Sequence, residues 1–359
     1  MFDHHTTPAP CQSSLDEMRL VATRRVSPEE EERYQEAIFR LVGALPQARF
    51  QVTSSGAEAI QQVLFSCFLE KARKEGKTHF ITSCIEDAPL LQMMKRCEEL
   101  GCTVHIVPVE KSGQVDLAAL KALVTPRTAL ISLSMAHGLT GVIQPYEEIG
   151  RFAQEKGILF HLDVSWGLGK ILFSFADLPV DYLTFSGSWI HSIPASGGIF
   201  AKPTVPLVPL IVGSPPDLPT LAALSSAARL ALLALDGVAL ECIRLRDLFE
   251  EELIQKIPGV QILFCENRLP NVTVALFPRV HHEALAYFLE RRGLYPNQSG
   301  MIFQKLDKLL AASQIKTESA LSFSFSRMTT EAQVKEGARL LTESIAWLQK
   351  MSEDVPCTI

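Results

Sequence analysis

Histidine is the side chain best suited to hold a metal or to move a proton near neutral pH. The candidates in this sequence are His4, His5, His137, His161, His191, His281 and His282. His4-His5 and His281-His282 are adjacent pairs, and neighbouring side chains on a strand or helix point apart. The sequence contains no HExxH motif and no compact His/Asp/Cys spacing. It therefore disfavours a metal enzyme.

Cysteine and serine are the available nucleophiles. The eight cysteines form no CxxC pair and no zinc-finger spacing, which is typical of reduced thiols in a cytoplasm, most of them small core residues. The segment "TFSGSWIH" (184–191) lacks the G-x-S-x-G motif of a serine nucleophile elbow. The pattern therefore does not predict a serine hydrolase.

Three places have the residue types of a site for an anion or a cofactor. Residues 184–200, "TFSGSWIHSIPASGGIF", have the pattern of a strand ending in Ser-Gly, a turn and a Gly-Gly strand. Gly56 lies in "VTSSGAEA" at a predicted helix start, where backbone N–H groups can bind an anion. Asp163 ends the segment "FHLDV", where a carboxylate can pair with a cofactor or cap the strand.

Alternating strand and helix patterns position these residues. Between about residues 78 and 163 the predicted strands are "THFITSC", "CTVHIVPV", "TALISLS" and "ILFHLDV", and helical segments separate them. Parallel strands need helical crossovers of this length, so the alternation predicts an α/β fold with a mainly parallel sheet and helices on both faces. Two further strands, "DYLTFSG" and "GGIFAK", follow.

Helical and α+β patterns flank this sheet. Residues 27–45 begin with Ser-Pro-Glu, a helix start signal. After a Pro-rich stretch at 205–219, a long helical region at about 220–255 is expected to link two domains. The segments "VQILF", "NVTVALF", "HHEALAYFLERRG", "ALSFSFS" and a closing helix then predict a small α+β domain.

Composition narrows the possible partners. The chain has 359 residues, 47% of them hydrophobic, and a formal net charge of −6 without a basic stripe, which argues against nucleic acid. The most apolar run, residues 221–240, is interrupted by Arg229 and Asp236, so a buried helix is expected rather than a membrane span. The opening "MFDHHTTPAP" lacks the basic and apolar parts of a signal peptide. A cytoplasmic protein without nucleic acid or membrane partners is therefore expected.

Several phrases, in order along the chain, resemble those of the NifS-like cysteine desulfurases in the class V aminotransferase family. "DHHTTP" is similar to their Asp-Asn-Ala-Ala-Thr-Thr-Pro opening, and "VTSSGAEA" to their phosphate loop. Residues 141–171 resemble their Gly-Thr-Ile-Gln-Pro segment and the His-Val-Asp-Ala-Ala-Gln strand after it. Residues 267–278 and 321–334 resemble two strands of their small domain. The combination is specific and covers nearly the whole chain.

This resemblance implies the pyridoxal phosphate (PLP)-dependent transferase fold type I. The expected large α/β domain spans 17–255, including the linking helix, and has a mainly parallel seven-stranded sheet. The expected small C-terminal α+β domain spans 256–359 and is joined by the N-terminal segment 1–16. The family also implies a homodimer with the site at its interface, and a desulfurase or a sulfur-acceptor protein as a possible further partner.

The resemblance places part of a cofactor site on this chain. Asp163 matches the carboxylate that pairs with the pyridine nitrogen, and Ser186 matches a phosphate-contacting hydroxyl. Gly56 and Ala57 match the phosphate loop, although Ala57 replaces its Thr. The Schiff-base Lys, however, matches Trp189, and the His before it matches Ser188. No Lys lies between Lys170, where the family commonly has a non-catalytic Lys, and Lys202.

Other positions of the family's site also differ. The stacking His matches Asp87, the ring-contacting Asn and Gln match Gly138 and Trp166, and the substrate-binding Arg matches Ser322. The loop "GLYPNQSGMIFQK" (293–305) lacks the Cys that receives sulfur, and Cys265 and Cys357 lie outside it. We expect the indoles of Trp166 and Trp189 to fill much of the space of a pyridine ring.

The sequence is compatible with two functions. One is a non-catalytic homologue, retained as a dimeric interaction or regulatory protein, that no longer holds PLP as a Schiff base. The other is an active PLP-dependent desulfurase or aminotransferase whose lysine has moved elsewhere. A yellow aldimine that borohydride traps would favour the second.

Overall fold

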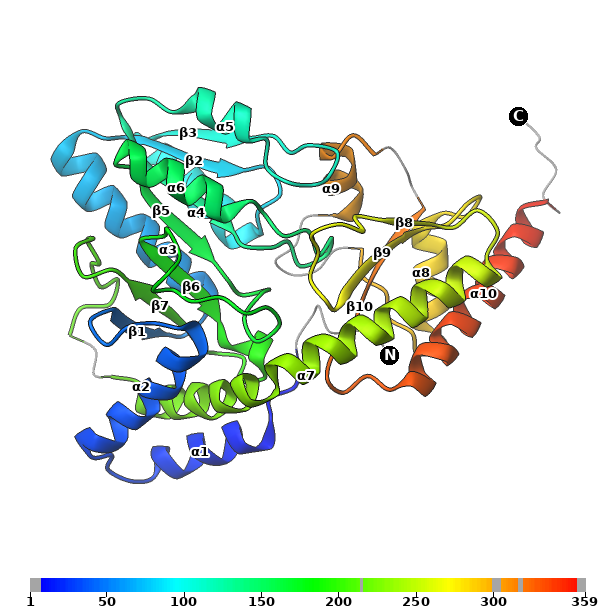
Figure 1. Cartoon of the computed structure of the whole chain (residues 1–359), viewed down its shortest axis with the longest axis horizontal. Helices are drawn as coiled ribbons and strands as arrows, with labels where there is room; N and C mark the ends of the chain where they lie inside the picture. The colour runs from blue at the N-terminus through cyan, green and yellow to red at the C-terminus, as the bar shows by residue number, and fades with distance from the viewer. Residues whose placement is uncertain (1–7, 214–215, 299–304, 316–318, 354–359) are drawn as a thin grey trace.

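The structure is a computed structural model that describes residues 8–213, 216–298, 305–315 and 319–353. His4, His5 and Cys357 lie outside these residues. A seven-stranded sheet and a three-stranded sheet are each covered by helices, and one long helix runs past both (Figure 1). This arrangement confirms the predicted α/β class and the small α+β part.

The large sheet has the strand order β1-β7-β6-β5-β4-β2-β3. Strand β7 is antiparallel to both of its neighbours, and the other pairs are parallel. The central strands are buried on both faces, as expected where helical crossovers cover a parallel sheet. The strands are β1 (Arg49–Thr53), β2 (His79–Ser83), β3 (Thr103–Val107), β4 (Thr128–Ser134), β5 (Leu159–Asp163), β6 (Tyr182–Ser186) and β7 (Gly197–Ala201).

Helices join these strands. They are α3 (Gly56–Cys67), which continues as a π-helix η1 (Phe68–Arg73), α4 (Ala88–Glu99), α5 (Leu117–Leu123), α6 (Tyr146–Lys156) and the 3₁₀ turn η2 (Gly187–Ile190). Helices α1 (Gln12–Ala22) and α2 (Pro28–Val42) pack against α7 (Leu218–Lys256). The predicted start of α2 is confirmed, because Ser27 and Glu30 cap each other's backbone N–H groups.

The smaller sheet is antiparallel, in the order β10-β9-β8. Its own hydrophobic core includes Phe249 of α7 together with Phe277 and Phe323. The elements of this part are β8 (Gln261–Leu263), β9 (Val272–Leu276), α8 (His282–Glu290), α9 (Leu306–Ala312), β10 (Ala320–Ser324) and α10 (Glu331–Glu353).

Helix α7 is, by length and composition, the one helix among the described residues that could cross a membrane. More than half of its most apolar window (56%) is buried inside the protein, as in the core helix of a soluble fold. Leu224 and Ala227 lie in the core of the large sheet, and Leu245 and Phe249 lie in the core of the small one.

Some elements go beyond the sequence prediction. Strand β1 and helices α1 and α9 did not stand out in the sequence. Helix α1 continues across residue 16, where the linking segment was expected to end, so the domain bounds stay a proposal. The expectation that His281 and His282 point apart is wrong: their rings stack with centroids 4.7 Å apart. His281 is the N-cap of α8 and so lies outside the regular helix.

Candidate functional site

Most of the predicted site residues meet at one edge of the large sheet, where its parallel strands end. Asp163 is the last residue of β5 and Ser186 the last residue of β6, and Asp87 follows β2. Gly56 begins α3 just beyond the end of β1. In open α/β sheets, ligands bind at this carboxyl edge. The topology therefore brings together residues from distant parts of the chain.

The Gly56 turn packs directly on Ser186. A Cβ on Gly56 would lie 2.9 Å from the Ser186 Cβ, so only glycine allows this approach. The Ser186 Oγ is 2.9 Å from the Ser188 Oγ. The N–H and hydroxyl of Ser54 already donate to Glu58 Oε2 at 2.8 and 2.5 Å. Ala57, in the first turn of α3, adds no hydroxyl.

Asp163 is buried and held on one side by hydroxyl and backbone donors. Thr184 Oγ1 donates to Oδ2 at 2.7 Å, and the Ser165 N–H donates to Oδ1 at 3.1 Å. His161 Nε2 lies 2.8 Å from the same Thr184 hydroxyl. Burial raises the pKa of the Asp163 carboxyl above its ordinary value. Burial also lowers the pKa of His161 to about 3, so this network contains a neutral imidazole.

The two tryptophans at degenerate family positions contact each other. Their ring centroids are 4.0 Å apart and their planes are tilted by 40°. Trp166 is buried, and its Nε1 donates to Asp87 Oδ2 at 2.8 Å. Trp189 is half-buried and packs on the hydrophobic core. Trp166 thus contacts both Asp87 and Trp189. The resemblance matches all three to positions around the pyridine ring.

Two consecutive acids with raised pKa values, Glu86 and Asp87, follow β2 beside Trp166. Desolvation raises the pKa of Asp87 to about 8, because burial penalises the charged form. Its neighbour Glu86 accepts hydrogen bonds from the hydroxyls of Ser83 and Ser134, both at 2.6 Å. Burial raises the pKa of Glu86 to about 7. Sequence reasoning missed Glu86, although two consecutive acids directly after a strand were a usable signal.

Ser322, which the resemblance matches to the substrate-binding Arg, lies in the three-stranded sheet. Ser322 is in β10 and fully buried, and its Oγ donates to the Leu139 carbonyl at 2.6 Å. Leu139 follows Gly138 in the buried turn after β4. Ser322 therefore fastens the small sheet to the carboxyl edge of the large one and is inaccessible to a substrate.

Lys170 is the described lysine that contacts the tryptophan pair. Its Nζ donates to the Trp166 carbonyl at 3.0 Å. Burial lowers the pKa of the Lys170 ammonium to about 8. Lys202, by contrast, follows β7 at the opposite end of that strand from Gly197, which pairs with Ser186.

No cysteine or metal cluster joins the site among the described residues. Cys265 is exposed, and its Sγ lies 3.5 Å from the Ile262 carbonyl after β8. The residues that the structure describes contain no group of three or more His, Cys, Asp or Glu that could hold a metal ion.

The residues present fit PLP only in part. By the resemblance, Asp163 would pair with the pyridine nitrogen, and Ser186 and the Gly56 turn would hold the phosphate. Position 189, which the resemblance matches to the Schiff-base lysine, holds an indole that contacts Trp166. An indole N–H cannot form a Schiff base. The residues present therefore do not fit PLP bound covalently at position 189.

Comparisons with known proteins agree with the fold. A family model, Aminotransferase class-V, matches residues 24–199. Cysteine desulfurase of Nostoc sp. is 29% identical over 333 residues, covering 88% of this chain and 82% of the relative. Cysteine desulfurase 2 of Trichormus variabilis is 30% identical over 335 residues, covering 86% and 84%.

The solved structure of a NifS-like protein superposes with a TM-score of 0.87 at 26% identity, covering 97% of this chain and 99% of the other. The similarity thus extends over both sheets and the long helix between them. The chain belongs to the NifS-like group of the class V aminotransferase family and has its fold type I architecture.

Proposed function

We propose that this NifS-like chain has lost Schiff-base catalysis and acts as a non-catalytic interaction or regulatory homologue. The contact between Trp166 and Trp189, with Trp166 hydrogen-bonded to Asp87, is the observation that supports the proposal. PLP catalysis depends on a lysine amine that attacks the cofactor aldehyde. Here an indole stands at that position and packs on a second indole.

Other positions support the same proposal. Ser322 is buried and bonded to the Leu139 carbonyl, so the substrate carboxylate loses its expected partner. Asp87 replaces an aromatic face with a carboxyl whose pKa burial raises to about 8. Positions 87, 189 and 322 would all serve the same PLP reaction in the resembled family. Changes at all three favour loss of that reaction as a whole.

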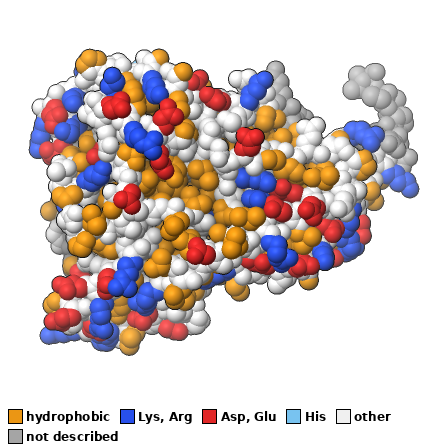
Figure 2. All heavy atoms as spheres, in the orientation of Figure 1, with side chains coloured by type: hydrophobic (Ala, Val, Ile, Leu, Met, Phe, Trp, Pro, Cys, Tyr) orange, Lys and Arg blue, Asp and Glu red, His pale blue; other side chains and the backbone are white. Residues whose placement is uncertain are grey.

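We also propose that the protein is a cytoplasmic homodimer that binds a desulfurase or a sulfur-acceptor protein. Large apolar side chains are exposed at Leu172 (80%), Val212 (88%) and Leu233 (84%), and a second copy of the chain would cover such residues at low cost. Figure 2 shows Lys and Arg side chains interspersed with Asp and Glu on the visible face, without a basic stripe. This pattern favours a protein partner over nucleic acid.

Borohydride trapping tests the loss of catalysis. The purified protein is mixed with PLP, reduced with borohydride and digested, and modified lysines are identified by mass spectrometry. We expect no stoichiometric adduct on a single lysine. The matched control is a Lys170→Met variant treated in the same way.

The alternative function, an active enzyme with a relocated lysine, makes the opposite prediction. Lys170 is its best candidate, because its ammonium has a pKa of about 8 and contacts Trp166. A yellow protein with a stoichiometric adduct on Lys170, lost in Lys170→Met, would establish that alternative. Sedimentation of the full chain tests the dimer, which would have twice the 39.7 kDa of one copy.

A further inference from the structure

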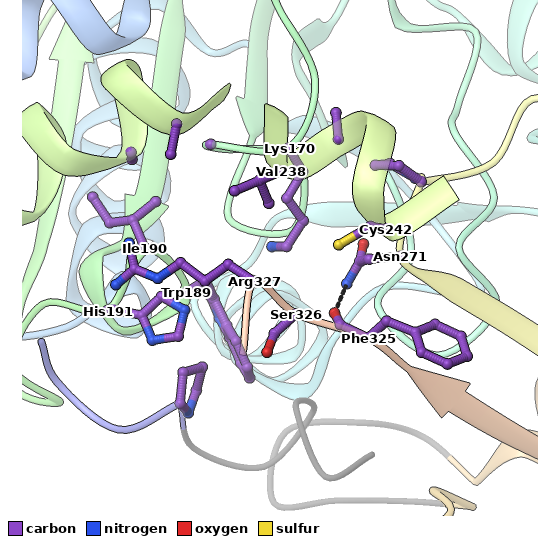
Figure 3. Close-up of a pocket in the computed structure, with 16 residues that line it drawn as sticks. Lys170, Trp189, Ile190, His191, Val238, Cys242, Asn271, Phe325, Ser326 and Arg327 are labelled. Atoms are coloured by element: carbon purple, nitrogen blue, oxygen red, sulfur yellow. Dashed lines mark hydrogen bonds between the residues drawn. The ribbon is translucent and has the colours of Figure 1, made fainter. Parts of the chain in front are cut away.

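A pocket that is partly open to solvent lies beside Trp189, between helix α7 and the end of the small sheet. Six separate parts of the chain line it: Pro8, the Gly169–Lys170 turn, the residues from Trp189 to His191, helix α7, Pro270–Asn271 and Phe325–Arg327 (Figure 3). The proposed loss of Schiff-base chemistry assigns no role to this cavity.

Two cationic side chains enter the cavity. Figure 3 shows the Lys170 ammonium projecting into it, with the Arg327 side chain extending along the Trp189 side. No aspartate or glutamate is among the described residues that line it. Two cations that face one pocket repel each other, and an anion bound between them would relieve this repulsion.

Asn271 supplies a buried acceptor without a partner. The side chain is only 6% exposed, and its Nδ2 donates to the Phe325 carbonyl at 3.2 Å, which fixes its orientation. The Oδ1 of Asn271 has no hydrogen-bond partner among the described residues. A buried acceptor of this kind requires a donor, so a ligand that carries one would be favoured.

The rest of the wall is apolar and held in place. Trp189, Ile190 and Val238 line it with hydrocarbon and indole surface. His191 has a left-handed backbone with φ 65°, its carbonyl accepts from Cys11 N–H at 2.8 Å, and its Nδ1 lies 3.0 Å from the Ala9 carbonyl. The segment that includes Pro8 is therefore fastened to this side of the cavity.

We propose that this cavity binds a small organic carboxylate that carries a hydroxyl group on an apolar body. Lys170 and Arg327 pair with the carboxylate, Asn271 Oδ1 accepts from the hydroxyl, and Trp189 covers the apolar part. Inorganic phosphate fits less well, because the apolar part of the wall offers it no donor. The proposal does not depend on whether the chain is catalytic.

The test uses matched pairs of ligands with the full chain. Mandelate and phenylacetate, or lactate and propionate, differ only in the hydroxyl, and benzyl alcohol and inorganic phosphate serve as controls. Binding is measured by calorimetry and by the change in tryptophan fluorescence. Mandelate should bind at least about tenfold more tightly than phenylacetate, a difference of about 1.4 kcal/mol. Benzyl alcohol and phosphate should bind more weakly than either acid.

Three variants connect binding to the cavity. Lys170→Met should weaken mandelate binding by about tenfold or more, and Val238→Trp, which fills the space, should abolish it. Lys202→Met removes a cation that does not line the cavity and should leave the Kd unchanged. Equal affinity within each ligand pair, failure of the hydroxy acids to bind, phosphate binding as tight as that of mandelate, or unchanged binding in Val238→Trp would each overturn the proposal.

Discussion

Trp166 and Trp189 contact each other through their indole rings, with centroids 4.0 Å apart, and Trp166 Nε1 bonds Asp87. Offset aromatic pairs contribute about 0.5–1.5 kcal/mol beyond the area that they bury. The two indoles and Asp87 therefore form a packed, hydrogen-bonded contact. This contact should stabilise the fold, and mutation can measure its contribution.

Truncation of Trp166 should destabilise the protein more than truncation of Trp189. Trp166 is only 4% exposed, so Trp166→Ala should lower the free energy of unfolding by about 3–5 kcal/mol. Trp189 is half-buried, and its alanine variant should lose less. Trp347→Ala is the control, because Trp347 is 45% exposed. Urea denaturation would contradict this view of the site if all three variants lost equal stability.

Asp87 should make stability fall as pH rises. Its folded pKa is about 8 and its ordinary value 3.8, so the folded state keeps a proton that the unfolded state releases. The contribution of Asp87 is full below about pH 4 and is lost as pH rises through about 8. Asp87→Asn should therefore stabilise the protein by ~1–3 kcal/mol at pH 8 and by less at pH 5.

Thermal unfolding across this pH range measures the effect. Glu155→Gln changes an exposed acid and should leave the pH profile unchanged. Some pH dependence should remain in Asp87→Asn, because burial also raises the pKa of Glu86 to about 7. An Asp87→Asn variant with the wild-type profile would show that Asp87 is ionised in the folded protein.

An arginine at position 322, where the resemblance places the substrate-binding Arg, should destabilise the fold. Ser322 is fully buried, and its hydroxyl bonds the Leu139 carbonyl at 2.6 Å. Ser322→Ala should cost about 1 kcal/mol for the lost hydrogen bond, whereas Ser322→Arg buries a charge and should cost about 3 kcal/mol or more. Equal stability of Ser322→Arg and wild type in urea denaturation would mean that the cleft is open there.

The strand–helix alternation and the family phrases predicted the class of the fold and the residues at the carboxyl edge. Strand β1 was missed because "RFQVT" is short and lies at the sheet edge, half-buried, with little periodicity. The Asp87–Trp166 and Ser322–Leu139 hydrogen bonds join residues 79 and 183 positions apart. Such contacts depend on how the sheets pack, which no local pattern encodes.

The cavity beside Trp189 was also beyond prediction. Lys170 looked like an ordinary family residue, and Asn271 like part of a strand start. Lys170 and Asn271 line the same pocket only because α7 packs against the small sheet. The match of Trp189 to the family's Schiff-base lysine stays a prediction, because it depends on the resemblance and not on a contact in the structure.

The Glu250–Arg268 pair should stabilise the join between α7 and the small sheet. Arg268 donates from both guanidinium nitrogens to Glu250, at 2.6 and 2.9 Å, and both side chains are largely buried. Arg268→Ala removes both hydrogen bonds to a buried carboxylate and leaves it Arg246, whose Nε is 4.0 Å from Glu250 Oε1, so it should cost up to about 3–5 kcal/mol. Arg244→Ala breaks exposed pairs with Glu241 and Glu331 and should cost about 1 kcal/mol or less.

A double variant tests whether the unpaired charge of Glu250 causes the loss of stability in Arg268→Ala. Glu250→Leu combined with Arg268→Met removes both charges, so the double variant should be more stable than Arg268→Ala alone in urea denaturation. Were the double variant the weaker of the two, packing of the long side chains rather than charge pairing would explain the loss.

Helix α7 limits how the two sheets can move relative to each other. Its 39 residues form a rod about 58 Å long at ~1.5 Å per residue, and the rod is embedded at one end in the large sheet's core and at the other in the small sheet's core. Swinging one sheet against the other must flex this rod. Gly237, exposed near its middle with open space where a Cβ would lie, is its most pliable point. Relative motion of the two sheets should therefore bend α7 mainly at Gly237.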